Sequence, residues 1–289
     1  MAEPDWALIL HGGARTISPR RQDANRRGCT AAARVGAAIL AQGGSALDAA
    51  EAAVRALEDD MTFNAGSGSV PTRDGDVEMD AAIMDGSTLA IGAVAALRGV
   101  RNPVEVARLL LEEPPVLLVG EGAAAFARDR GVPSYAVPAA LDADQQHDTV
   151  GCVALDRSGH IAVATSTGGL PGQWPGRVGD APIPGCGYYA DDHAGGVAIS
   201  GDGEAILRTH LAAHIVGQLY RQPIAAAVAA GLASLARVGG EAGIVALDRA
   251  GRFGIAHNSD HFAVALATSA RPDPVAGIVA ADFEDYLHD

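Results

Sequence analysis

The segment His147-Asp-Thr-Val-Gly151 places a threonine where a polar, unpatterned stretch meets an apolar one. A threonine hydroxyl is a weak nucleophile until a base removes its proton. If the peptide bond before Thr149 is cut, the freed α-amine, with a pKa of about 7.7–8.0, can serve as that base. A β-branched residue at the start of a strand gives the same local pattern. The hypothesis of a nucleophilic Thr149 therefore depends on its neighbours.

Three further features suit such a nucleophile. Thr167 ends a run of small hydroxyls on a strand expected to pair with that of Thr149, which places both at the open end of a hairpin. Arg177 and Asp180 lie in a Gly- and Pro-rich loop, where an Arg fork can hold a carboxylate and an Asp an ammonium group. A structural ion pair is the alternative. Ser200-Gly201 can form an oxyanion hole, or an ordinary helix N-cap.

The elements that must position these residues alternate between helix-rich and strand-rich stretches. Apolar periodicity predicts helices over residues 22–42, 45–59, 103–112, 121–130, 203–221 and 223–237. Short apolar runs predict strands over 6–10, 77–84, 91–97, 116–119, 149–155, 161–166, 244–247 and 252–257, the first stopped by Gly12-Gly13. This order fits a four-layer αββα sandwich of the α/β (α+β) class, as a single domain over residues 1–289, better than a doubly wound sheet.

Two of the predicted hairpins share a sequence, VALDRSGHIAVATS from residue 153 and VALDRAGRFGIAHNS from residue 245. The motif occurs only twice, so we interpret it as a recurring sheet-building unit and not as a solenoid repeat. Residues 131–148 are polar and unpatterned, and they form the best linker in the sequence. That linker ends directly before Thr149.

Composition excludes several classes of function. The formal net charge of −14 argues against nucleic-acid binding, which calls for basic patches, and against an anionic membrane surface. Three cysteines, with no CxxC motif, are typical of a reducing, cytoplasmic protein. We expect neither a signal peptide nor a transmembrane helix.

A metal-binding or regulatory protein is a rival from another class. His210 and His214 are four residues apart on the predicted helix 203–221. The segment between them lacks the Glu of the HExxH pattern, and the sequence offers no third ligand. We therefore interpret both as ordinary surface or core histidines and expect no cofactor for catalysis.

In order along the chain, the segments resemble the plant-type asparaginase / isoaspartyl peptidase family of N-terminal-nucleophile hydrolases. The matching segments cover most of the chain and are Ile9–Ala14, Phe63–Val70, Val77–Gly86, Gly92–Ala95, His147–Gly151, Ala164–Gly169 and Gly176–Gly185. The resemblance implies the αββα fold and autocleavage between Asp148 and Thr149. It further implies an α chain of residues 1–148, a β chain of residues 149–289, and an (αβ)₂ assembly of two cleaved protomers.

The resemblance also implies the catalytic roles. Thr149 is the nucleophile, its freed amine is the base, and Thr167 orients it. The N–H of Gly201 and the hydroxyl of Ser200 form the oxyanion hole. Asn64 positions the region around the nucleophile.

A small-molecule substrate follows from the same resemblance. Arg177 holds its α-carboxylate, and Asp180 holds its α-ammonium group. The implied reaction is hydrolysis of the β-amide of asparagine or of a β-aspartyl dipeptide through a Thr-bound β-aspartyl intermediate. Family members also often hold a structural sodium ion with a loop of backbone carbonyls, which here are those of Leu57, Glu58, Asp60, Phe63, Ala65 and Ser67.

The chain departs from the family pattern at several places. Asp148 replaces the usual glycine before the nucleophile, Ser200 replaces a threonine, Gln173 replaces a lysine, and the glycine-rich stretch at 239–243 is altered. An Asp-Thr junction is typical of the related glycosylasparaginases, so cleavage of N-acetylglucosaminyl-asparagine is the alternative activity. An uncleaved, inactive binding protein is the third reading, and the intact set of site residues argues against it.

Overall fold

The computed structural model describes residues 4–138 and 149–287. The larger sheet contains β1 (Ala7–Arg15), β2 (Met79–Asp85), β3 (Ile91–Leu97), β4 (Leu117–Val119), β5 (Thr149–Leu155), β6 (Ile161–Thr167), β11 (His261–Thr268) and β12 (Arg271–Gly277). Its strand order is β12-β11-β1-β5-β6-β2-β3-β4. The smaller sheet contains β7 (Tyr188–Asp191), β8 (Gly195–Gly201), β9 (Ala242–Asp248) and β10 (Phe253–His257). Its order is β10-β9-β8-β7.

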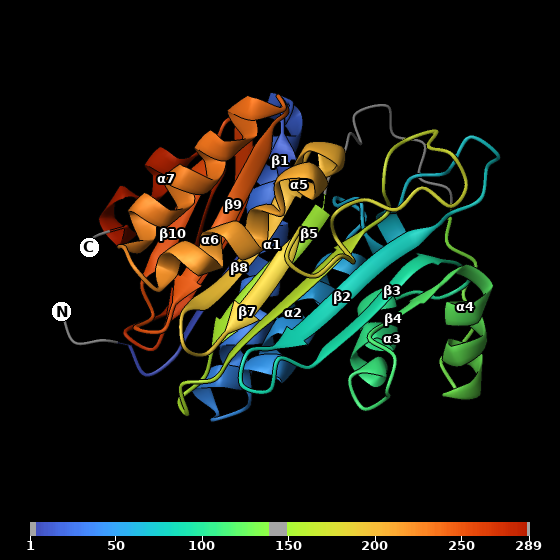
Figure 1. The fold of residues 1–289 in the computed structure, drawn as a ribbon, viewed down its shortest axis with the longest axis horizontal. Coiled ribbons are helices and arrows are strands. Elements are labelled where there is room, and N and C mark those ends of the chain that lie inside the picture. The colour runs from blue at the N-terminus through green and yellow to red at the C-terminus, as the bar shows by residue number, and fades with distance from the viewer. Residues whose placement is uncertain (1–3, 139–148, 288–289) are drawn as a thin grey trace.

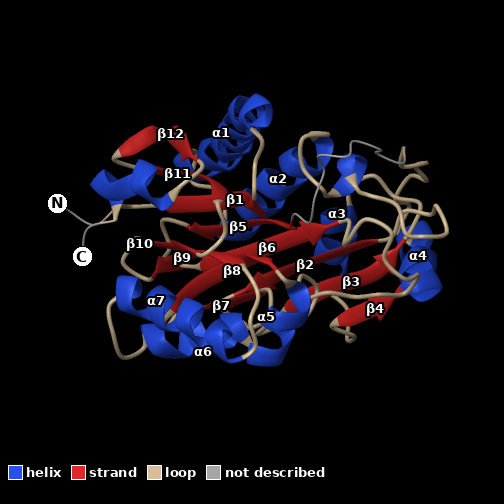
Figure 2. Cartoon of the chain, turned by 90° about the horizontal axis from the view of Figure 1, so that it is seen from above, coloured by secondary structure: helices blue, strands red, loops and turns tan. Residues whose placement is uncertain are grey.

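Helices cover the outer face of each sheet (Figure 1, Figure 2). Those against the larger sheet are α1 (Pro19–Ala41), α2 (Ala46–Asp59), α3 (Pro103–Leu110) and α4 (Gly120–Asp129). Those on the side of the smaller sheet are α5 (Gly203–Thr209), α6 (Leu211–Leu219) and α7 (Ile224–Ser234). Short 3-10 turns are η1 (Gly66–Gly68), η2 (Leu235–Arg237) and η3 (Ala280–Tyr286).

Local sequence signals explain where several helices begin. Ser45 caps α2 by accepting a hydrogen bond from the N–H of Asp48 at 3.1 Å. Pro19 and Pro103 occupy the first turns of α1 and α3, where a missing N–H costs nothing. These starts agree with the sequence-based expectation to within a few residues.

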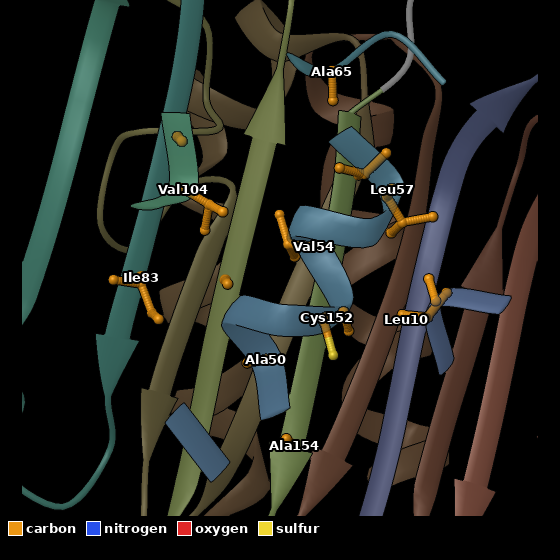
Figure 3. Packing of buried hydrophobic residues seen from close by; sticks show 14 of the residues in the cluster. Leu10, Ala50, Val54, Leu57, Ala65, Ile83, Val104, Cys152 and Ala154 are labelled. Carbon is orange, nitrogen blue, oxygen red and sulfur yellow. The ribbon is translucent and has the colours of Figure 1, made fainter. Parts of the chain in front are cut away.

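Three separate apolar clusters fill the spaces between the four layers. The first joins α1–α3 to the larger sheet, and Figure 3 shows Val54 and Leu57 of α2 above Cys152 of β5. The second lies between the two sheets and contains Val153 of β5. The third joins the smaller sheet to its helices and contains Ile199 of β8. Three cores between four layers confirm the predicted αββα sandwich.

Alternation along β5 decides where Thr149 points. Val150 and Cys152 belong to the helix-side core, whereas Val153 and Leu155 belong to the core between the sheets. Side chains alternate between the faces of a strand, so Thr149 shares the face of Val153. The nucleophile predicted from sequence therefore faces the smaller sheet.

Some sequence-based expectations about elements were wrong. The first strand does not stop at Gly12-Gly13. It continues to Arg15, and its pairing shifts between His11 and Gly13. The predicted helix 203–221 is broken at His210, which has a φ of 47° and separates α5 from α6. A left-handed residue cannot continue a helix, so the break is structural.

The break at His210 also corrects the placement of His210 and His214 on one helix. The imidazole Nδ1 of His210 lies 3.7 Å from the sulfur of Cys186. Among residues 4–138 and 149–287, no three His, Cys, Asp or Glu side chains gather as metal ligands. Within the same ranges, no helix is both long enough and apolar enough to cross a bilayer.

Candidate active site

Thr149 and Thr167 are directly opposed in the antiparallel pair of β5 and β6. Opposed residues on one face have Cβ atoms about 4.5–5.5 Å apart. Both are largely buried, with 7% and 4% of their surfaces exposed. The structure therefore brings together the two threonines that the sequence placed at one end of a hairpin.

Ser200, at the end of β8, lies across from Thr149 on the facing sheet. Its Oγ accepts hydrogen bonds from the backbone nitrogen of Thr149 at 3.3 Å and from the N–H of Ala14 at 3.1 Å. It is not a helix cap, because Asp202 caps α5. A hydroxyl that accepts two bonds still has one proton to donate. Ser200 can therefore hold the nitrogen of Thr149 and also donate to a substrate oxygen.

Arg177 and Asp180 line a small cavity together with Thr149, Thr167 and Gly201. All five residues were singled out from the sequence, and they come from two strands of the larger sheet, the end of β8 and one loop. The clamp, as we call Arg177 and Asp180, therefore opens onto the proposed nucleophile and oxyanion hole.

Two buried acids at the start of β2 hold the loop that carries the clamp. Glu78, just before the strand, accepts a hydrogen bond from the N–H of Gly176 at 2.7 Å, and Asp80 accepts one from the backbone of Gly179. Asp80 also faces Thr167 in the register of β2 and β6. The sequence indicated a strand here but not these anchoring roles.

The clamp and its surroundings contain more acidic than basic side chains. Burial raises the pKa of Asp180 to about 7, and its own backbone N–H and Arg177 oppose the rise. Burial likewise raises the pKa of Asp80 to about 6, against the backbone N–H groups that it accepts and Arg177. With Glu204, three carboxyl groups surround one guanidinium. A bound ammonium group would relieve this imbalance.

Glu204, in the first turn of α5, is a site residue that the sequence reasoning missed. Its two carboxylate oxygens accept from Nε and Nη2 of Arg177 at 3.0 and 2.8 Å. These two hydrogen bonds use the Nε and Nη2 edge of the guanidinium. The remaining nitrogen, Nη1, lies beside Gly179, and Gly179 lines the small cavity. Glu204 lies at the start of the helix predicted over residues 203–221, and nothing local in the sequence points to Arg177.

Asn64 fixes the turn that follows Thr167. Its side-chain amide donates to the carbonyl of Gly169 at 2.7 Å and accepts from the N–H of Val70 at 3.0 Å. Its own carbonyl accepts from the N–H of Gly168 at 2.8 Å. Asn64 therefore ties the end of β6 to the loop around η1.

His11 lies beside the nucleophile strand but is a poor candidate for the base. A Cβ on Gly151 would come within 2.6 Å of its Nε2, so the buried imidazole leaves room only for glycine there. Burial lowers the pKa of the imidazole to about 3, against a smaller opposing effect from the backbone of Thr149. A group of such low basicity removes protons poorly near neutral pH.

Among the residues that the resemblance assigns to a sodium ion, Phe63 and Ser67 are buried. The carbonyl of Asp60 accepts from the N–H of Phe63 at 3.1 Å. A Cβ on Gly68 would clash with the carbonyl oxygen of Phe63, and the buried hydroxyl of Ser67 finds no hydrogen-bond partner in the part of the chain that is described. Oxygen donors of this kind fit a hard cation.

Of the departures from the family pattern, Gln173 lies within the described residues and Asp148 does not. Gln173 is buried and its side-chain carbonyl accepts from the N–H of Leu170 at 2.9 Å, so it braces the loop before the clamp. Asp148 lies outside the described residues, and with it the predicted cleavage site on the N-terminal side of Thr149.

Comparison with known proteins agrees with this geometry. The family model described as Asparaginase matches residues 4–139 and 135–276. The chain belongs to the asparaginase family. As a member of this family, the chain is an amidohydrolase.

Asparaginase-family relatives cover nearly the whole chain. The "Isoaspartyl peptidase/L-asparaginase" of Bos taurus is 40% identical, across 91% of this chain and 94% of its own length. The protein of the same name from Danio rerio is 40% identical, across 91% and 93%. The one from Homo sapiens is 45% identical over 71% of this chain and 74% of its own.

Proposed function

We propose that the protein is an autoprocessing isoaspartyl peptidase / L-asparaginase that uses Thr149 as its nucleophile. One observation carries the proposal. Thr149 opposes Thr167, its nitrogen is held by Ser200, and the Arg177–Asp180 clamp opens onto the same cavity. The names of the relatives support the substrate class, which is asparagine or a β-aspartyl dipeptide.

Maturation begins with an N→O acyl shift. The Oγ of Thr149 attacks the carbonyl carbon of Asp148, the peptide nitrogen leaves as an amine, and an ester links the two residues. Water then hydrolyses that ester and releases the carboxylate of Asp148. The contact between Ser200 and the nitrogen of Thr149 supports this step, because it holds the future α-amine in place. The products are chains 1–148 and 149–289, which we expect to pair as (αβ)₂.

Catalysis then uses the exposed amine as the base. It takes the proton from Oγ of Thr149, which attacks the β-carbonyl carbon of the substrate. Gly201 N–H and the Ser200 hydroxyl stabilise the oxyanion. The leaving amine departs with a proton, and water hydrolyses the β-aspartyl ester to release aspartate. Arg177 and Asp180 hold the α-carboxylate and α-ammonium groups throughout.

A structural sodium ion and a cytoplasmic location complete the proposal. The carbonyls of residues 57, 58, 60, 63, 65 and 67 would hold the ion and stiffen the loop before Asn64; no catalytic step passes through it. The three cysteines are free and buried, which supports a reducing compartment.

Side-by-side assays test the proposed reaction. The purified protein should release aspartate from a β-aspartyl dipeptide and from asparagine, and the Thr149→Ala variant should release none. Turnover of N-acetylglucosaminyl-asparagine alone would replace the proposal with a glycosylasparaginase. Absence of turnover with all three substrates would favour a binding protein.

A further inference from the structure

A second cavity, of about 380 Å³, opens beside the small cavity that contains Thr149. The two share Leu170, Gly201 and Gly203. Neither Thr149 nor the clamp lines the second cavity. It therefore adjoins the oxyanion hole at Gly201 without including the nucleophile or the clamp side chains.

The geometry of the attacked carbon indicates which part of the substrate lies in the second cavity. In the tetrahedral intermediate the carbon carries the Oγ of Thr149, the oxyanion at Gly201, the substrate chain that leads to the clamp, and the leaving nitrogen. The clamp and Gly201 fix two of these directions. The leaving nitrogen takes a remaining direction, and the second cavity, which adjoins Gly201, is open to it.

We infer that the second cavity binds the leaving amino acid of a β-aspartyl dipeptide and favours one with a basic side chain. The inference rests on the proposed function and names its preferred substrate. Ammonia, the leaving group from asparagine, needs no such volume. A cavity of a few hundred cubic ångströms is the size that small-molecule ligands occupy.

The charges that line the cavity favour a cationic side chain. Asp202, Glu204 and Glu241 contribute three carboxylates, of which that of Glu204 is paired with Arg177, against one guanidinium from Arg15 among the described lining residues. Arg15 is buried, with 5% of its surface exposed, and suits the free α-carboxylate of the leaving amino acid. The carboxylate of Glu241 is then available to the side chain of the leaving amino acid.

Glu241 is the acid best suited to a test. Asp202 caps α5, and Glu204 is paired with Arg177, so replacing either would disturb the helix or the clamp. Glu241 is exposed, and its side chain makes no hydrogen bond or ion pair with any residue in the ranges 4–138 and 149–287. Glu112, exposed just after α3, offers a matched control for loss of one negative charge.

The experiment compares kcat/KM of the cleaved protein for β-aspartyl-lysine, β-aspartyl-norleucine and β-aspartyl-glutamate. We expect the order lysine, norleucine, glutamate. Glu241→Gln should lower the lysine-to-norleucine ratio by about two- to fivefold, the range of an exposed ion pair, and Glu112→Gln should leave it unchanged.

The possible failures are distinct. If all three peptides are cleaved but the lysine-to-norleucine ratio is one, or is the same in the wild type and Glu241→Gln, the inference is overturned and the proposed function stands. If none is cleaved while the protein processes normally, the proposed function itself is wrong.

Discussion

The two hairpins that share a sequence motif differ in what surrounds them. In β5–β6, Asp156 accepts hydrogen bonds from the N–H groups two and four residues later at 2.8 and 3.1 Å. In β9–β10, Asp248 accepts from the same relative positions at 2.9 and 3.0 Å. The motif therefore specifies one turn twice. It does not specify which hairpin carries the chemistry.

The two hairpins differ in the residues at their open ends and in their places in the sheets. The position of Thr149 is taken by Glu241 in the second hairpin, and that of Thr167 by Ser259. The first hairpin lies inside the larger sheet, between β1 and β2, whereas β10 is an edge strand. Function follows from the neighbours, because the hydroxyl of Ser200 is bonded to the nitrogen of Thr149 and the clamp residues line the cavity that contains Thr149.

Replacing the nucleophile should have the largest effect. Thr149→Ala is expected to abolish both self-cleavage and turnover, since loss of a nucleophile costs on the order of 10⁶ in kcat. Denaturing gels and aspartate release measure the two. The matched change in the other hairpin, Ser259→Ala, should keep both; equal loss in the two variants would remove the distinction between the hairpins.

Ser200→Ala comes next. We expect kcat of the cleaved protein to fall by about 10²–10³-fold, as for loss of one oxyanion donor. Ser200→Thr keeps the hydroxyl and should keep most of the activity. A Ser200→Ala variant with wild-type kcat would show that the facing strand of the smaller sheet takes no part in catalysis.

The clamp gives the first hairpin a pH dependence that the second lacks. Because the pKa of Asp180 is raised to about 7, its carboxylate is lost as the pH falls below that value. A neutral carboxyl binds an ammonium group weakly, so KM for asparagine should rise about tenfold between about pH 8 and pH 6. Steady-state kinetics across this range measure it. A flat KM profile would mean that Asp180 does not hold the ammonium group in its ionised form.

The smallest expected effect is on stability, and it concerns the turns of the two hairpins. The second carboxylate oxygen of Asp156 accepts from the N–H of Ala46 in α2 at 3.0 Å, whereas that of Asp248 accepts from the half-exposed Arg252 at 2.7 Å. Asp156→Ala should therefore cost roughly 2–3 kcal/mol of unfolding free energy, and Asp248→Ala roughly 1 kcal/mol. Urea denaturation measures both unfolding free energies. Equal losses in the two variants would show that the surroundings of the two turns contribute equally to stability.

The sequence predicted the elements whose signals are local. The strands of the first hairpin, the helix predicted over residues 45–59 and the order of layers all follow from periodicity and turn residues. β12 did not, because it is an edge strand whose seven residues include two prolines. β7 and β11 were likewise missed.

The site was predictable where motifs carry it and not where tertiary contacts do. Thr149, Arg177 and Ser200 stood in recognisable segments. Glu78 and Glu204 act on residues that lie 98 and 27 positions away in the chain, at distances that no local pattern reveals. Their roles appear only when β2 and α5 meet the clamp loop.

Intact-mass measurement with N-terminal sequencing of the purified protein detects the cut before Thr149 itself. We expect two chains, residues 1–148 and residues 149–289, the second beginning with Thr149 and its free amine. A single full-length chain that still hydrolyses a β-aspartyl substrate, or a second chain that begins at any other residue, would contradict this expectation.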